Sequence, residues 1–173
     1  MHIYVLDTGA LLSQWTTKNP NLAFITTQSV IDEIQNRPSK NRVQNLLSTD
    51  RLRIASPDAD SIEKTEKKAR EIGDYGVLSQ EDLELISLGL KQKHLGHEVS
   101  VVSSDLALLN TAAALGLRTS DPTGRMKEKI TWVLKCPGCG NEESASISHL
   151  ECPVCGTEMR RKPKKREKIN CSE

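Results

Sequence analysis

The chain has 173 residues, of which 36% are apolar and 3% aromatic, and its formal net charge is +1. This length supports one medium-sized domain with or without a small satellite, and the composition is sufficient for a buried core. The first residues show no signal-peptide pattern, and no window reaches the roughly 20 apolar residues of a membrane span. These features argue against a secreted or membrane protein, and we expect a cytoplasmic protein without a membrane partner.

Apolar runs alternate with amphipathic segments through the first 120 residues. The box Ser79-x-x-Asp82 is typical of a helix start, and Gly116 is typical of a helix end. In chain order we predict a strand at 2–6, a helix at 8–14, a strand at 23–26, helices at 28–36 and 39–49, a strand at 51–55, helices at 58–72 and 79–94, a strand at 99–102 and a helix at 106–115. This alternation is typical of an α/β domain with a parallel sheet.

The turn signal Asp121-Pro122-Thr123-Gly124 indicates a domain boundary. Residues 1–120 carry 13 basic and 15 acidic groups, whereas residues 121–173 carry 11 and 8, so the positive charge is concentrated toward the C-terminus. We therefore expect four segments: the α/β domain at 1–120, a linker at 121–130, a small domain at 131–159 that a strand at 130–135 enters, and a basic tail at 160–173.

Two carboxylates follow predicted strands, and ligands of open parallel sheets bind at the carboxyl ends of strands. Asp7 ends the first strand, and Asp105 follows the strand at 99–102 through Ser103-Ser104. If the strands are neighbours, both carboxylates lie on the same edge; the alternative is that each merely caps the next helix. Asp7-Thr8-Gly9 is also the triplet of aspartic proteases, but those are all-β, and here a helix-rich chain follows.

Two further carboxylates lie on predicted helices. On a helical wheel Asp82 lies about 50° from the centre of the apolar arc, whereas Glu81 and Glu84 lie about 150° away and are expected to face solvent. Asp82 therefore needs a partner, which is Ser79 of the capping box or a cation. Glu33 lies on the flank of its helix, where the alternative is a solvated residue. Four carboxylates without histidine or cysteine suit the hard cations Mg²⁺ and Mn²⁺.

Four segments, VLDTGALL, SVIDEIQN, LSQEDLELISLG and VVSSDLALLNTAAALGL, occur in this order over residues 1–119. Their order resembles the acidic pattern of the PIN-domain ribonucleases. The resemblance implies a parallel sheet flanked by helices and a metal-dependent endoribonuclease that leaves a 3′-hydroxyl and a 5′-phosphate. It also implies that Ser104 helps to position metal or phosphate, and that the catalytic, Mn²⁺- or Mg²⁺-binding residues are Asp7, Glu33, Asp82 and Asp105.

The cysteines form the pattern C-x₂-C-x₁₂-C-x₂-C, with Cys136 and Cys139 in the first pair and Cys152 and Cys155 in the second. Each pair is followed by a glycine, which allows the tight turn of a zinc knuckle. Four soft thiolates without an open position favour one structural Zn²⁺ per chain in a zinc ribbon, over an iron–sulfur cluster or disulfides. Cys171 has no partner motif, and we expect a free thiol.

The tail is strongly basic, and beside a nuclease domain such a tail favours phosphate binding over the alternative of a solvated, disordered end. We expect Trp132, just before the first cysteine, to be a core or interface residue, with base stacking as the alternative. The predicted RNA-binding residues are Arg160, Arg161, Lys162, Lys164, Lys165 and Arg166.

A PIN-like domain followed directly by a zinc ribbon is similar to the compact archaeal nucleases that mature the 3′ end of small-subunit ribosomal RNA. That resemblance implies precursor 16S ribosomal RNA in the pre-30S particle as the substrate, with other assembly factors as further partners. Two alternatives stay open. One is a toxin-type PIN ribonuclease with another RNA target, although such toxins are usually a bare domain, and the other is a non-catalytic RNA-binding assembly factor.

Overall fold

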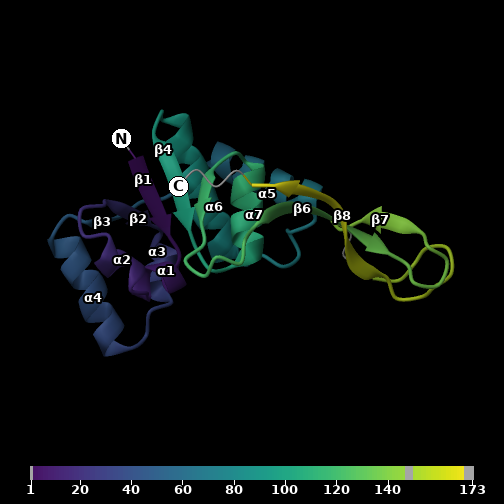
Figure 1. Cartoon of the computed structure of the whole chain (residues 1–173), viewed down its shortest axis with the longest axis horizontal. Helices are drawn as coiled ribbons and strands as arrows, with labels where there is room; N and C mark the ends of the chain where they lie inside the picture. Colours follow the sequence, from purple (N-terminus) through teal and green to yellow (C-terminus); the bar gives the residue numbers. More distant parts are fainter. Residues whose placement is uncertain (1, 147–149, 170–173) are drawn as a thin grey trace.

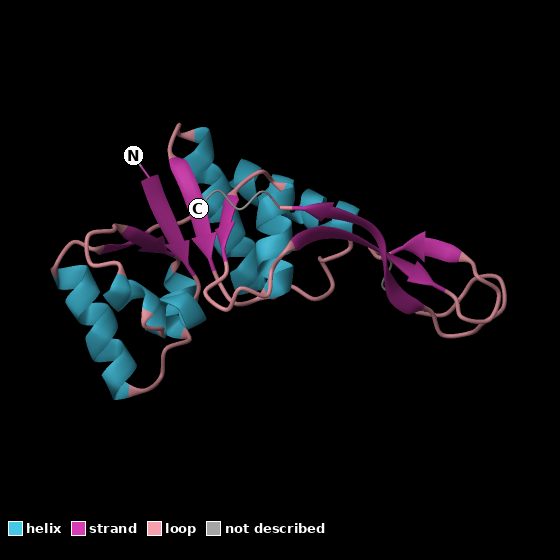
Figure 2. Ribbon diagram, in the orientation of Figure 1, coloured by secondary structure: helices cyan, strands magenta, loops and turns pink. Residues whose placement is uncertain are grey.

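The computed structural model describes residues 2–146 and 150–169, which form a helix-flanked α/β domain and a projecting ribbon (Figures 1 and 2). Cys171, expected to be a free thiol, lies outside the described residues. In chain order the elements are β1 (His2–Leu6), α1 (Thr8–Leu12), α2 (Trp15–Lys18), β2 (Phe24–Thr26), α3 (Gln28–Asp32), α4 (Arg37–Ser48), β3 (Leu52–Ile54), α5 (Ala59–Ile72), α6 (Gln80–His94), β4 (Glu98–Val102), α7 (Leu106–Ala114), β5 (Arg118–Ser120), β6 (Glu128–Lys135), β7 (Glu142–Ser144) and β8 (Arg160–Lys168).

The main sheet is parallel, with the strand order β3-β2-β1-β4-β5. From the central strand β1 the chain first builds outward through β2 and β3, and later through β4 and β5 on the other side. The order therefore reverses between β1 and β4, where Leu6 pairs with Val102. In open α/β sheets this reversal opens a crevice at the carboxyl ends of the strands. The two predicted edge carboxylates follow these two strands.

The core consists of apolar side chains from the sheet and from the helices packed on it. Helix α6 contacts β1, β4, α5 and α7, and its residues Leu83 and Leu85–Leu90 are all buried. Because other elements pack against α6 on several sides, its buried residues do not form one narrow stripe opposite a solvent-exposed side. The prediction of one apolar arc on this helix was therefore too simple, which affects the acidic residues discussed below.

The expected strands of the α/β domain are all present. Two expected helices are shorter, because α1 ends at Leu12 and α3 at Asp32, and several short elements were not predicted. Helix α3 ends at Asp32, and α4 begins at Arg37 after Asn36, whose side chain accepts a hydrogen bond from the Ser39 backbone. Pro38 lies in the first turn of α4, where its missing N–H costs nothing, so the chain starts a new helix there. Helix α2 and strands β5, β7 and β8 were not predicted, because they are too short or too polar to show a clear periodicity of apolar residues.

The ribbon differs most from the sequence-based expectation. Its antiparallel sheet has the order β7-β6-β8. Strand β6 starts within the expected linker, at Glu128, and the expected tail forms β8, which pairs along the whole of β6. Cross-strand ion pairs join Lys129 to Glu167 at 3.2 Å and Arg166 to Glu128 at 3.1 Å. Pro163 is tolerated because β8 is an edge strand, and it lies at the bulge of the β6–β8 ladder.

A buried carboxylate joins the ribbon to the α/β domain. Asp74, after α5, is 1% exposed and forms an ion pair with Arg161 of β8. It also accepts hydrogen bonds from Asn110 at 2.6 Å and Thr111 at 3.3 Å. The Arg161 guanidinium lies 4.1 Å from the centre of the Trp132 ring. Trp132 is therefore an interface residue, as predicted.

Gly73 allows this close approach. Its φ is +79°, and a Cβ atom there would lie 2.5 Å from the Cβ of Ala145 and 3.1 Å from that of Trp132. A side chain at position 73 would therefore collide with the ribbon, and glycine lets the end of α5 pack closely against it.

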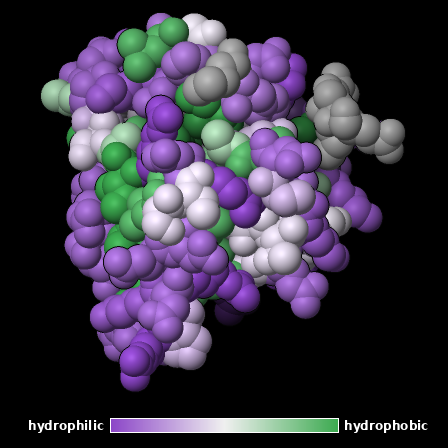
Figure 3. Space-filling model, turned by 90° about the vertical axis from the view of Figure 1, so that its left-hand side faces the viewer, coloured by the Kyte–Doolittle hydropathy of each residue, from purple (hydrophilic) through white to green (hydrophobic). Residues whose placement is uncertain are grey.

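The surface is largely polar. Seen from the side of α4, it is mostly hydrophilic, with hydrophobic patches among the polar side chains (Figure 3). Within residues 2–146 and 150–169, every helix is too short or too polar to cross a membrane.

Candidate active site and metal centre

The carboxyl ends of β1 and β4 bring Asp7 and Ser103 together. The Ser103 hydroxyl donates a hydrogen bond to Asp7 Oδ2, and the Ala10 backbone N–H donates to Oδ1 at 2.5 Å. Ser103 Oγ also accepts from the Asp105 backbone N–H at 2.9 Å. Asp7 therefore caps α1 and is linked to Asp105 through Ser103. This arrangement agrees with the prediction that both carboxylates lie on the same edge of the sheet.

Two of the predicted carboxylates, Asp82 and Asp105, act on the third, Asp7. Burial raises the pKa of Asp7 above its ordinary value, against the hydrogen bonds from Ser103 and Ala10, which lower it; the negative charges of Asp82 and Asp105 raise it further. Like charges that share a site disfavour ionisation. A cation among these carboxylates would relieve this repulsion.

Asp82 and Asp105 also perform the capping roles that were the structural alternatives. Asp82 Oδ2 accepts from the Ser79 backbone at 2.9 Å and from the Ser79 hydroxyl at 2.8 Å. Asp105 Oδ1 accepts from the backbones of Ala107 and Leu108 at the start of α7. These bonds use Oδ2 of Asp82 and Oδ1 of Asp105, so in each carboxylate the other oxygen is left for a further ligand. Capping and cation binding are therefore compatible.

Glu33 is exposed, and its side chain accepts a hydrogen bond from Thr8, the residue after Asp7. This bond directs Glu33 toward the acidic edge. Neighbouring Asp32 is exposed, and its carboxylate accepts a hydrogen bond of 2.8 Å from Gln28, one turn earlier on the same helix.

Two glutamates of α6 differ from their prediction. Glu81 and Glu84, both expected to face solvent, are half-buried because α6 is packed against neighbouring elements, and Glu84 accepts a hydrogen bond of 2.5 Å from Ser29 of α3. Ser103, which the sequence did not single out, contacts the Asp7 carboxylate. The Ser104 hydroxyl lies on the exposed edge, 3.7 Å from the position of a Cβ at Gly9, and its role toward metal or phosphate stays a prediction.

The donor set of this edge fits a hard divalent cation, because all its ligand atoms are carboxylate oxygens. The side chains are not drawn tightly together: in the described ranges, only the cysteines bring three or more candidate ligand atoms within 4.8 Å of one another. The residues that would hold Mn²⁺ or Mg²⁺ are Asp7, Glu33, Asp82 and Asp105.

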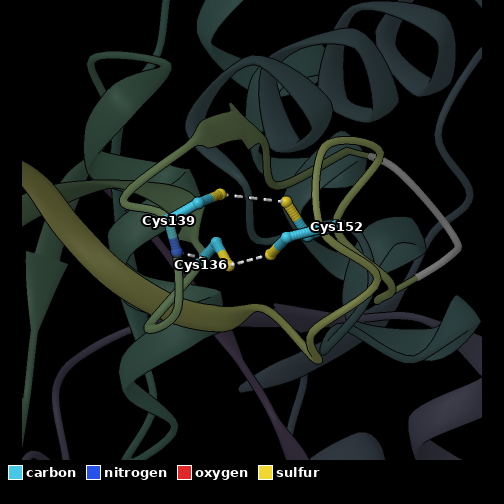
Figure 4. A group of neighbouring side chains, drawn as sticks. Cys136, Cys139 and Cys152 are labelled. Atoms are coloured by element: carbon cyan, nitrogen blue, oxygen red, sulfur yellow. Dashed lines mark hydrogen bonds between the residues drawn. The ribbon is translucent and has the colours of Figure 1, made fainter.

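The four cysteine sulfurs converge between the two knuckles of the ribbon, and those of Cys136, Cys139 and Cys152 point toward one another in Figure 4. Sγ of Cys136 lies 3.4 Å from Sγ of Cys155, and Sγ of Cys139 lies 3.5 Å from that of Cys152. These distances are far beyond a disulfide bond of about 2.05 Å. They approach the roughly 3.8 Å between sulfurs that tetrahedral Zn–S bonds of about 2.3 Å require.

The knuckle backbone supports this geometry. Gly140 and Gly156 have φ of +78° and +71°, and the N–H of each donates to the carbonyl of the first cysteine of its pair. Hydrogen bonds with the side chain and backbone of Thr157 lower the pKa of the Cys155 thiol to about 6, which favours the thiolate that zinc binds. The Asn141 backbone lowers the pKa of the Cys139 thiol, but hydrogen bonds with the other three thiols raise it to about 12, so this thiol loses its proton only to a bound cation.

We predict that Cys139→Ser lowers the zinc content below one ion per chain and unfolds the ribbon, because its own apolar cluster is small: Leu134, Cys136, Cys152, Met159 and Ala145. Native mass spectrometry measures the zinc content, and limited proteolysis measures the folding. Ser144→Ala in the same ribbon is the control. Full zinc occupancy in Cys139→Ser would refute the assignment.

The six predicted RNA-binding residues of β8 divide into two groups. Arg161 is bound to Asp74, Arg166 to Glu128 and Lys165 to Glu167. Arg161, predicted to bind RNA, thus contributes to the interface with the α/β domain because the buried Asp74 needs a cation. In the described part of the chain the exposed side chains of Arg160, Lys162 and Lys164 form no ion pair.

Comparisons with known proteins agree with this arrangement. The family described as "PIN domain of ribonuclease" matches residues 4–91. The chain is 29% identical to "Endoribonuclease Nob1" of Archaeoglobus fulgidus, over 91% of this chain and 89% of that protein. It is 30% identical to "Ribonuclease VapC1" of Thermoplasma acidophilum, over 96% of this chain and 81% of that protein. A shorter match, 34% identical over 49% of this chain and 19% of the other, is to "20S-pre-rRNA D-site endonuclease NOB1" of Saccharomyces cerevisiae.

The match to the family extends over half of the chain and includes Asp7, Glu33 and Asp82. Asp105 follows β4, the strand parallel to β1, and archaeal endoribonucleases match the chain beyond that point into the ribbon. The chain therefore belongs to the PIN-domain ribonucleases and is an endoribonuclease with a cysteine-bearing ribbon.

Proposed function

We propose that this protein is a divalent-metal-dependent endoribonuclease that cleaves precursor small-subunit ribosomal RNA at the 3′ end of 16S, within the pre-30S particle in the cytoplasm. The observation that carries the proposal is the extent of the similarity to archaeal Nob1. It covers 91% of this chain and 89% of the relative, so it includes the ribbon as well as the α/β domain. The yeast relative, whose name is that of a pre-rRNA endonuclease, supports the same target class.

The acidic edge supports the hydrolysis of a phosphodiester. Asp7 is fixed by Ser103 and Ala10, and Asp82 by Ser79, so these carboxylates are oriented before RNA binds. A divalent cation held there would acidify a water and neutralise phosphate charge. Glu33, bonded to Thr8 beside Asp7, and Asp105, linked to Asp7 through Ser103, would add negative charge for that cation. The proposed hydrolysis would leave a 3′-hydroxyl and a 5′-phosphate.

The ribbon supports affinity for RNA. We predict that replacing Arg160, Lys162 and Lys164 together with glutamine flattens the salt dependence of RNA binding, because each phosphate contact contributes a slope of about −0.7. Loss of three contacts should therefore change the slope by about 2. Fluorescence anisotropy over a salt titration measures this change. An unchanged slope in the zinc-loaded variant would show that this face of β8 does not contact RNA.

Two alternative functions are a toxin-type ribonuclease and a non-catalytic assembly factor. A toxin-type ribonuclease is favoured by the VapC1 match, which covers 96% of this chain, so the appended ribbon is a weaker argument against it than the sequence suggested. Cleavage of RNA spanning the 16S 3′ end, compared with unrelated single-stranded RNAs of equal length, separates the two. Preference for an unrelated RNA would favour the toxin type, and binding without cleavage would favour the assembly factor.

A further inference from the structure

A cleft of about 950 Å³ runs from the acidic edge to the ribbon. At one end it is lined by Ser104 and Asp105, and at the other by Trp132 and Arg166. Helix α7 forms one wall, and the segment between β5 and β6 forms another. In Figure 1 this segment crosses below the ends of β1 and β4 before it enters β6. The cleft thus connects the two parts of the molecule to which RNA is expected to bind.

One arginine is fixed where the cleft meets the acidic edge. Arg125 Nη2 donates to the Ser104 carbonyl at 2.7 Å, and Nε donates to Thr123 Oγ1 at 2.9 Å. The segment itself is organised by Asp121, whose carboxylate accepts from the backbones of Thr123, Arg125 and Met126. The arginine is exposed, and its remaining N–H groups are not used by these bonds.

The basic side chains that line the cleft differ in whether they have a carboxylate partner. Arg161 and Arg166 have carboxylate partners, Asp74 and Glu128. In contrast, Arg125 and Lys127 form no ion pair with any carboxylate in the described residues, although both line the cleft. These two cations are therefore available to an anionic ligand that enters beside Ser104.

We propose that this cleft binds the single-stranded RNA segment adjoining the scissile bond, with Arg125 and Lys127 contacting its backbone phosphates. The proposal rests on the proposed role of the acidic edge as the site of cleavage. Phosphates are the class of ligand indicated, because a planar guanidinium held at two points presents a fork that matches phosphate oxygens. The apolar part of the cleft, with Leu106, Ile130 and Trp132, offers contact area to sugars and bases.

The alternative is that Arg125 only attaches its segment to Ser104. The two roles predict different responses. A purely structural arginine affects stability and not the salt dependence of binding. Lys127 distinguishes the structural role from RNA binding more sharply. It forms no ion pair in the described residues, so its replacement should not affect folding.

The test measures RNA binding by the zinc-loaded full chain. A chelator that binds zinc more weakly than the cysteine site removes other divalent cations, so that cleavage is not required. The probe is a fluorescein-labelled single-stranded RNA of about 12 nucleotides. For the double variant Arg125→Gln, Lys127→Gln we expect binding about tenfold weaker and a salt slope flatter by about 1.4. Lys127→Gln alone should show about half of the slope change. The matched control is Lys18→Gln, Arg37→Gln, two exposed residues at the far end of the α/β domain.

The outcomes are distinct. Normal affinity and slope in Lys127→Gln and in the double variant would overturn the proposal, as would parent protein without salt-dependent affinity for this RNA. If the double variant does not fold, Lys127→Gln alone decides. Arg125→Lys, which keeps the charge and loses the fork, should recover the slope but only part of the affinity. Absence of cleavage by the parent with Mn²⁺, together with the expected binding changes, would contradict the proposed function and leave the cleft assignment intact.

Discussion

Replacing Asp82 with asparagine should reduce the rate of RNA cleavage by about 100-fold or more, because loss of a cation ligand removes several kcal/mol of transition-state stabilisation. If Asp82 served only the capping box, the substitution would cost about 1 kcal/mol of stability and leave cleavage nearly unchanged. Cleavage rates over an Mn²⁺ titration, with melting curves of the same variant, distinguish the two roles.

Glu81→Gln is the control for this experiment, because Glu81 is the neighbouring acidic residue of the same helical turn. Fold and RNA binding should survive in Asp82→Asn. Without added cation its stability should fall little, since the charge of Asp82 no longer acts on Asp7, whose pKa it raises. Equal cleavage rates of the two variants would show that Asp82 is not part of the catalytic site.

Replacing Arg161 with methionine should destabilise the protein by about 3 kcal/mol at neutral pH, because it leaves the buried Asp74 carboxylate without a counter-ion. Burial already raises the pKa of Asp74, while the hydrogen bond from Asn110 and the charge of Arg161 lower it. Loss of Arg161 raises the pKa further. Denaturant unfolding of parent and variant at several pH values measures the effect.

The sign of the pH dependence follows from proton uptake by Asp74. Below its raised pKa the carboxyl is neutral in the folded state and needs no cation, so the difference in stability between parent and variant should shrink as the pH falls through the folded-state pKa of the variant and then that of the parent. It should be largest above both folded-state pKa values. Arg160→Met, an exposed neighbour on the same strand, should be nearly neutral. If Arg161→Met weakened RNA binding with no change in stability, the original prediction of an RNA contact would hold instead.

The parallel sheet could be predicted because its strands are short β-branched runs separated by helical periods. The meeting of Asp7 with Asp105 followed from one topological rule about parallel strands, and the thiolate site followed from spacing alone. In each case the signal is local in sequence or depends on a general property of the fold.

The remaining features depend on contacts between distant residues. Strand β8 resembles a charged tail in sequence, because its pairing is set by its partner β6, and acidic residues such as Glu128 and Glu167 neutralise part of its charge. Asp74 gave no signal in a polar loop, since its partner Arg161 lies 87 residues later. Glu84 was assigned to the surface because a helical wheel assumes one buried side, and α6 has several.

The central claim is that the acidic edge cleaves precursor ribosomal RNA, and its most direct test is to map the products nucleotide by nucleotide. Parent protein and Asp7→Asn are incubated with RNA spanning the 3′ end of small-subunit ribosomal RNA, with Mn²⁺ and with chelator. We predict one dominant cut at the mature 3′ end, with a 3′-hydroxyl, for the parent with Mn²⁺ only. Cleavage that persists in Asp7→Asn, or that is spread over the RNA without preference for that end, would contradict the claim.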